Sequence, residues 1–271
     1  MDAELISSQA KLPKASYAVR TVRTITALVL REMGSKYGRT PGGYAWAILE
    51  PVGMIVLLSI GFSIIVRSPP LGSSFLLFFA TGYLPYGFYG SSSENTSSAM
   101  RYSKPLLAYP AVTWLDAIIA RWTLNFLTSA TVFCIIITGI FALTEVRTNL
   151  DLTSIFLGMF MTACLGLGVG LMNCTLNGLF PVWRNIWGIL TRPLFLASGV
   201  LYVYEDLPKS AQDILWWNPL LHMTGLVRKG FYSEYDARFV NYSFCWMVIL
   251  VLIALGLVFL RANYQRVLEE S

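Results

Sequence analysis

One apolar segment of the chain carries tyrosine and serine side chains at helical spacing. Tyr83, Tyr86, Gly90, Ser93 and Ser97 follow one another at steps of three or four residues, which places them on one face of a helix. A polar stripe inside the bilayer is costly unless it faces protein or a water-filled path. Because a tyrosine ring can pack on a sugar ring while its hydroxyl forms hydrogen bonds, the stripe fits a path for a carbohydrate. The same spacing fits packing between helices, and the pattern leaves both interpretations open.

Two charged side chains stand next to a proline inside apolar runs. Arg192 precedes Pro193, and an arginine at bilayer depth costs about 2.5–3.5 kcal/mol on insertion scales, so we expect it to face a partner or a water-filled site. Glu50 precedes Pro51 and lies only about 10 Å deep at about 1.5 Å per residue. For Glu50 we expect a structural role, either reaching to the interface or pairing with a nearby arginine, with direct substrate contact as the alternative. For Pro51 we expect a kink in the helix.

Motifs for nucleotide binding, metal binding and covalent catalysis do not occur in the sequence. It contains no G-x-x-x-x-G-K-[S/T] stretch that could hold the phosphates of ATP. His222 is the one histidine, so no histidine pair at ligand spacing exists. No Ser/His/Asp set can be placed within one pocket. We therefore expect no catalytic residue, no metal site and no cofactor in this chain, and no enzymatic activity of its own.

The composition is that of a membrane protein with several spans. Of the 271 residues, 55% are hydrophobic and 13% are charged, whereas soluble domains carry roughly a quarter charged residues. The mean hydropathy is +0.59. The net charge is +5, from 20 Lys and Arg against 15 Asp and Glu, and seven of the 20 basic residues lie within the first 40 positions. Membrane topology explains this crowding better than nucleic-acid binding, so we expect no nucleic-acid partner.

Six apolar runs reach or approach the length of about 20 residues that a membrane-spanning helix needs. An even number of spans places both termini on the same side of the membrane. With the termini in the cytoplasm, the inner segments hold twelve Lys and Arg residues and the outer loops hold six, which agrees with the positive-inside rule. The predicted spans cover residues 44–66, 75–93, 115–142, 152–180, 186–203 and 240–260.

The segment before the first span has the pattern of an amphipathic helix. Ala18, Val22, Ile25 and Val29 recur on one helical face, and arginines follow the same spacing on another. Such a helix lies in the cytoplasmic interface with its arginines toward lipid phosphates. The fold predicted is an all-α, polytopic membrane protein of one domain. Its parts are a flexible cytoplasmic N-terminus (1–16), an amphipathic interfacial helix (17–40), a six-span domain (41–262) and a cytoplasmic tail (263–271).

Two connections within the six-span domain have a composition of their own. The longest inner connection, 94–114, carries basic residues beside a small apolar group, which suits docking onto a soluble protein. The outer segment 204–239 is too apolar for a plain loop and too broken by proline and charge to span. We expect a re-entrant helical hairpin there, on the periplasmic side, before the last span. In the fourth span, Gly166 and Gly170 continue a row of small residues, which predicts close packing with another helix.

Three segments resemble one family of transport proteins, and the similarity covers nearly the whole chain. REMGSKYGRTPGGYAWAILEP (31–51) is similar to the segment that leads into the membrane in the permease subunit of capsule polysaccharide ABC exporters. IIARW (118–122) and WNPLLHMTGLVRKGF (217–231) resemble two further segments of that family, in the same order. A departure is Pro41-Gly42-Gly43, where relatives often carry a bulkier and more basic triplet.

The resemblance implies a homodimeric permease that works with two copies of a separate ATPase. ATP and Mg would be bound by that ATPase, and the segment 94–114 would couple its motion to the membrane domain. The implied substrate is a lipid-linked, acidic capsular polysaccharide, moved across the bacterial inner membrane from cytoplasm to periplasm. Periplasmic and outer-membrane export proteins would complete the route.

On this basis we assign expected roles to individual residues. The anionic lipid head would enter near Arg20, Arg23 and Arg39. The remaining roles are conduit lining for Tyr83, Tyr86, Tyr89, Ser93 and Arg192, ATPase coupling for Arg101, Tyr102, Lys104, Leu106 and Leu107, and structural support for Glu50, Pro51, Gly166 and Gly170. Two alternatives stay open: an O-antigen or teichoic-acid ABC exporter permease, which shares the motifs, and a secondary transporter or membrane-embedded enzyme, which would need no ATPase.

Overall fold

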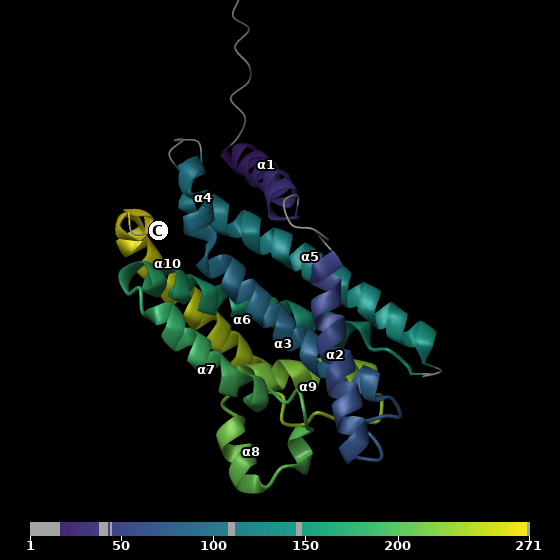
Figure 1. Ribbon diagram of the computed structural model, residues 1–271. Helices are drawn as coiled ribbons and strands as arrows, with labels where there is room; N and C mark the ends of the chain where they lie inside the picture. The colour runs from purple at the N-terminus through teal and green to yellow at the C-terminus, as the bar shows by residue number, and fades with distance from the viewer. Residues whose placement is uncertain (1–16, 38–42, 44, 108–111, 145–147, 270–271) are drawn as a thin grey trace, which may run out of the picture.

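The computed structural model describes residues 17–37, 43, 45–107, 112–144 and 148–269, and of 17–20 and 35–37 it describes the backbone alone. The described residues form helices joined by short connections, and no β-strand occurs among them. Figure 1 shows the arrangement. The helices are α1 (Tyr17–Tyr37), α2 (Ala45–Ile65), α3 (Phe75–Ser97), α4 (Ala99–Leu107), α5 (Trp114–Leu143), α6 (Leu152–Leu179), α7 (Trp183–Ala197), α8 (Lys209–Leu215), α9 (Pro219–Phe231) and α10 (Tyr242–Glu269), with a 3-10 turn, η1 (Tyr204–Asp206), before α8.

The all-helical prediction is confirmed, and four helices are long and apolar enough to cross a membrane. These are α2, α5, α6 and α10, which match the first, third, fourth and sixth predicted spans. Helices α3 and α7 occupy the places of the second and fifth. With 15 residues, α7 is about 22 Å long at about 1.5 Å per residue, shorter than a hydrocarbon core of about 30 Å. Six crossings and the cytoplasmic position of both termini stay predictions.

Helix α7 ends at Ala197, earlier than the run of apolar residues that predicted it. Gly199 follows with a φ of 69°, in the left-handed region that favours glycine. A Cβ atom there would lie 2.6 Å from Leu221 Cδ1, so the turn also needs a residue without a side chain. The apolar residues beyond Gly199 therefore belong to a folded connection and not to the helix.

Helix α6 is the centre of the bundle. It packs against α3 and α10 and against α9 (Figure 1), and 67% of its most apolar stretch is buried, compared with 17% in α2 and 22% in α5 and α10. The row of small residues explains the close contact with α3. A Cβ atom on Gly170 would lie 2.5 Å from Thr96 Cβ, and one on Gly166 would lie 2.6 Å from Ser92 Cβ.

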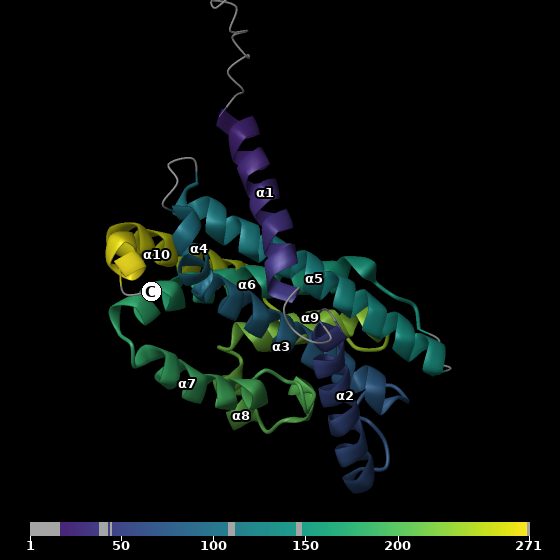
Figure 2. The ribbon, with the colours of Figure 1, turned by 45° about the horizontal axis from the view of Figure 1, so that its top comes forward.

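The predicted helix before the first span is present as α1, which lies at the edge of the bundle against α5 (Figures 1 and 2). Of the expected apolar face, Ile25 and Val29 are half-buried, whereas Val22 is 63% exposed. The face that meets α5 includes Glu32, which pairs with an arginine described below. Packing against α5 thus selects a slightly different face from the one that hydrophobicity alone predicts.

The connections 94–114 and 204–239 are more ordered than their composition indicates. Helix α3 runs to Ser97 and α4 starts at Ala99, so most of the inner connection is helical. In the outer one, Asn218 caps α9 by accepting a hydrogen bond from the amide of Leu220, and Pro219 fills the first helical position, where no amide is needed. Most of α9 is buried against α3 and α6. Its depth in the membrane, and a re-entrant course, stay predictions.

Candidate functional site

A cavity of about 520 Å³ lies between α2, α3 and α5. We call it the central cavity. Its lining combines aromatic rings with carboxylate, amide and hydroxyl groups, the mixture that binds hydroxylated ligands such as sugars. Glu50 of α2 lines it from one side. The other polar and aromatic lining residues are Tyr83, Tyr86, Phe88, Ser91, Glu94, Asn95, Asn125, Thr128, Ser129 and Phe133.

One wall of the central cavity is a chain of hydrogen bonds between α3 and α5. Asn95 Nδ2 donates to Asn125 Oδ1 at 2.8 Å and to the Ser91 carbonyl at 2.7 Å. Asn125 Nδ2 donates to Ser91 Oγ at 3.3 Å, and Ser91 Oγ lies 3.4 Å from Ser129 Oγ. Because the Asn95 amide bonds to both helices and the Asn125 amide bonds twice to α3, this wall keeps its polar groups in fixed positions.

The five residues predicted to line the conduit lie in three different places: two line the central cavity, two are buried, and one is exposed. Tyr83 and Tyr86 line the central cavity, and Tyr86 Oη also donates to the Thr191 carbonyl of α7 at 3.2 Å. Tyr89 and Ser93 are buried, with 4% and 5% of their surface exposed. Arg192 is exposed on α7. The structure thus brings two of the five together around a cavity, and the transport role of all five stays a prediction.

Glu50 faces the central cavity and is exposed. Among the described side chains the ion pairs are Arg121–Glu32 and Arg238–Asp236, so the expected partner of Glu50 is not found there. Arg39, one candidate for that pairing, falls outside the described residues. Pro51 lies within α2, which stays helical on both sides of it.

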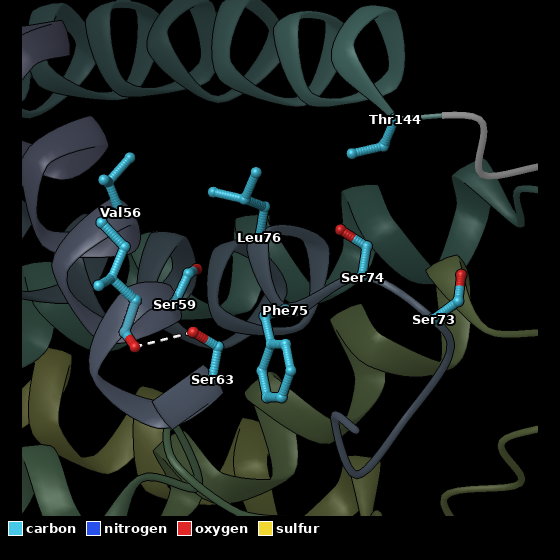
Figure 3. Close-up of a pocket in the computed structure, with 9 residues that line it drawn as sticks. Val56, Ser59, Ser63, Ser73, Ser74, Phe75, Leu76 and Thr144 are labelled. Atoms are coloured by element: carbon cyan, nitrogen blue, oxygen red, sulfur yellow. Dashed lines mark hydrogen bonds between the residues drawn. The ribbon is translucent and has the colours of Figure 1, made fainter. Parts of the chain in front are cut away.

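A second cavity, of about 620 Å³, opens between the other ends of the same three helices (Figure 3). Hydroxyl groups of Ser59, Ser63, Ser73, Ser74 and Thr144 line it beside apolar side chains. Several of these hydroxyls already donate to their own helix; the dashed line in Figure 3 marks the bond from Ser63 Oγ to the Ile60 carbonyl, at 2.9 Å. The two cavities together place polar groups along α3 from its last turns to its first residues.

The residues expected to meet an ATPase lie on α4. Arg101, Tyr102 and Lys104 are exposed, and Leu106 and Leu107 are half-buried. Lys104 Nζ donates to the Glu269 carbonyl at the end of α10, at 3.5 Å. The basic side chains of α4 therefore remain accessible to a partner on this face.

Arg121 of α5 joins three elements at the base of α4, a role that the sequence did not indicate. Its Nε lies 3.1 Å from Glu32 Oε1 of α1, and its Nη1 donates to the Ser98 carbonyl between α3 and α4 at 3.2 Å. Its guanidinium carbon lies 4.4 Å from the centre of the Tyr102 ring of α4. Arg121 is 7% exposed. The position falls within the segment IIARW, so the family resemblance was the one available signal.

The residues expected to receive the lipid head are only partly described. Arg23 is exposed on α1. Arg20 lies in α1, but its side chain, like all of Arg39, is outside the described part of the chain. The cluster expected of these three arginines is therefore not tested by the structure.

Comparison with known proteins places similarity along almost the whole chain. The family described as ABC-2 type transporter matches residues 23–232. The chain is 29% identical over 260 residues to the polysialic acid transport protein KpsM of Escherichia coli, covering 96% of this chain and 100% of that protein. It is 27% identical over 259 residues to the capsule polysaccharide export inner-membrane protein BexB of Haemophilus influenzae, covering 95% and 97%. CtrC of Neisseria meningitidis, with the same description, is 25% identical over 235 residues, covering 87% and 89%.

Proposed function

The chain belongs to the ABC-2 type transporter family, and we propose from this that it is the membrane subunit of an ATP-driven exporter of lipid-anchored capsular polysaccharide in the bacterial inner membrane. The observation that carries the proposal is the near full-length similarity to inner-membrane proteins of capsule polysaccharide export. The absence of a phosphate-binding loop in the sequence is consistent with ATP and Mg being bound by a separate subunit.

The central cavity supports a carbohydrate substrate. Tyrosine rings, carboxylates and fixed amides surround one volume there, and these groups satisfy both the apolar faces and the hydroxyls of a sugar. We propose that the glycan contacts Tyr83 and Tyr86 as it passes, with the hydroxyl-lined cavity of Figure 3 further along the same helices.

The working unit that we propose is a homodimer of this chain with two ATPase subunits. Six membrane crossings with both termini in the cytoplasm would place α4 on the cytoplasmic face, where its exposed basic residues meet the ATPase. The connection 204–239 would then lie on the periplasmic side, beside the periplasmic and outer-membrane proteins that receive the polysaccharide. The lipid anchor would reach the complex near Arg20, Arg23 and Arg39.

The test is deletion of the gene for this chain, followed by complementation in the same strain. We expect loss of surface capsule and accumulation of lipid-linked polysaccharide inside the cells, both reversed by the intact chain. A variant lacking residues 104–108 should insert into the membrane but no longer co-purify with the ATPase. Loss of O-antigen or teichoic acid with intact capsule would contradict the proposed substrate. Export by the purified chain without an ATPase would contradict the proposed mechanism.

A further inference from the structure

A smaller cavity, of about 220 Å³, lies where α4, the end of α6, the start of α7 and the end of α10 meet. We call it the arginine pocket. Arg101 of α4 and Arg184 of α7 line it together with Ser97, Ser98 and Asn177. None of the described residues that line it is acidic. Two cationic side chains from different helices therefore share one small polar volume.

The positive charge of the arginine pocket is not compensated by the described side chains. The ion pairs among the described side chains are Arg121–Glu32 and Arg238–Asp236, and neither Arg101 nor Arg184 takes part in them. The contact of Arg101 is with the ring of Tyr102, 5.3 Å from its guanidinium carbon. Like charges in one site repel each other, and an anion placed between them removes that repulsion.

A buried amide supplies a further polar group without a partner. Asn177 Oδ1 is shielded from solvent and takes part in no hydrogen bond. A buried polar atom without a partner costs free energy, so its presence beside the two arginines indicates that the pocket is completed by a ligand. Asn177 Oδ1 accepts hydrogen bonds, so a ligand that completes the pocket needs a donor such as a hydroxyl for this atom. It also needs anionic oxygens for the two guanidinium groups, and a phosphate ester of a polyol carries both.

Exposed apolar side chains stand close in the sequence to Pro181 and Arg184, which line the arginine pocket, and we call them the apolar rim. Phe180 is 58% exposed, Val182 64% and Ile186 42%, and these residues lie within a few positions of Arg184. No residue of α7 is buried. An anion with an attached acyl chain satisfies both parts of this surface, because its head meets the arginines and its chain covers the apolar rim.

We propose that the arginine pocket binds the phosphate-ester head of an amphiphile, with the acyl chain along Phe180, Val182 and Ile186. Resting on the proposed function, this names a holding site for the anionic head of the substrate's lipid anchor, distinct from the arginines of α1. Because Arg101 belongs to α4, a head bound in the pocket contacts the same helix that meets the ATPase. Occupancy of the pocket would thus bear directly on the position of α4.

The test measures binding of phosphatidylglycerol to the purified complex of the full chain with its ATPase, in phosphatidylcholine nanodiscs with and without phosphatidylglycerol. Native mass spectrometry counts the retained lipid. We expect R101Q/R184Q to bind it at least about tenfold more weakly, equivalent to about 1.4 kcal/mol. The matched control is R261Q, which removes an exposed arginine of α10 outside the pocket and should leave binding unchanged. A thermal unfolding midpoint equal to that of the unaltered chain establishes that each variant is folded.

Several results separate this proposal from its competitors. Restoration of binding in R101K/R184K supports an anion held by charge. Equal binding by R101Q/R184Q and the unaltered chain overturns the site. If inorganic phosphate competes for the site as strongly as phosphatidylglycerol does, the proposed role of the apolar rim is overturned. A loss of binding in R23Q, with R101Q/R184Q unaffected, places the head at α1 and overturns the pocket. Dissociation of a dimer by R184Q with unchanged lipid binding shows that a second copy covers this face and overturns the lipid site.

Failure of this proposal is distinguishable from failure of the proposed function, because lipid binding and capsule export are measured separately. If R101Q/R184Q loses lipid binding but exports capsule at the normal rate, the pocket is a lipid site without a role in holding the substrate anchor, and that part is overturned. If the unaltered chain does not restore capsule to the deletion strain, the proposed function fails whatever the lipid measurement shows.

Discussion

Replacing Arg121 by methionine should loosen the joint between α1, α4 and α5. Methionine keeps most of the side-chain volume but removes the ion pair with Glu32, the hydrogen bond to the Ser98 carbonyl and the contact with the Tyr102 ring. Arg121 is 7% exposed and the Glu32 side chain 16%, so water replaces these interactions poorly. The change should therefore act on stability first and on transport through the position of α4.

The expected cost follows from the three lost interactions. A hydrogen bond to a charged group contributes about 1.5–3 kcal/mol, and a cation–aromatic contact at a partly exposed site about 0.5–1 kcal/mol. Leaving one partner of a fully buried pair alone costs about 3–5 kcal/mol, but Glu32 is near enough to solvent to hydrate in part. We expect a total loss of about 3 kcal/mol.

The assay is thermal unfolding of the detergent-solubilised chain, combined with a double-mutant cycle of R121M and E32Q. Because the two side chains share one interaction, the double variant should be less destabilised than the sum of the single variants by about 1–2 kcal/mol. The matched control is R31M, which removes an exposed arginine next to Glu32 and should cost less than about 0.5 kcal/mol. Additive effects, or a loss in R121M no larger than in R31M, would refute the reasoning.

Three further predictions concern stability. Gly170→Val should lower the free energy of unfolding by about 1–3 kcal/mol or more, because a Cβ atom there would lie 2.5 Å from a carbon of α3. Gly139→Ala, where a Cβ atom would have no neighbour within 4 Å, should leave the free energy of unfolding unchanged, and thermal unfolding compares the two variants. Arg228→Met should release the connection before α8, because the buried guanidinium group donates to two backbone carbonyls of that connection, at 2.6 and 3.1 Å. Proteolysis between residues 198 and 208 should become faster, and cleavage at the rate of the unaltered chain would contradict the prediction. Burial lowers the pKa of His222, so the unfolded chain binds a proton more readily than the folded chain. The free energy of unfolding should therefore fall as the pH drops below about 6.5, the ordinary pKa of histidine, and thermal unfolding of His222→Gln should lack this pH dependence.

The helices could be predicted from the sequence because lipid imposes one rule on all of them. A backbone in hydrocarbon must satisfy its own hydrogen bonds, so long apolar runs become helices whatever their neighbours are. Where a helix ends because of a contact with a distant part of the chain, its end could not be predicted. Gly199 ends α7 because its conformation and the side chain of Leu221 require glycine there, and neither requirement is visible in hydropathy.

The site was predictable only as far as one helix determines it. The spacing of tyrosine and serine residues marked α3, and two of its tyrosines do line the central cavity. The opposite wall comes from Asn125 and Ser129 on α5, and their meeting with Asn95 depends on how two distant segments cross. The same limit applies to Arg121, whose partners lie on α1, on α4 and before α4. The periodicity of a sequence identifies one face of a helix, but it does not identify the residues of other helices that contact this face.

Unequal burial within the bundle fits the division of tasks that the proposed function requires. Helix α6 is buried along most of its length and is held to α3 by contacts that tolerate no added side chain. Helix α7 has no buried residue, and α1 reaches the bundle mainly through α5. Elements with few buried contacts move at low cost, whereas a closely packed pair keeps its geometry. An ATPase that displaces α4 would therefore shift the peripheral helices against a fixed α3–α6 pair. Because the central cavity is bounded by α3 on one side and by the loosely packed α2 on the other, such a shift would change the width of the cavity.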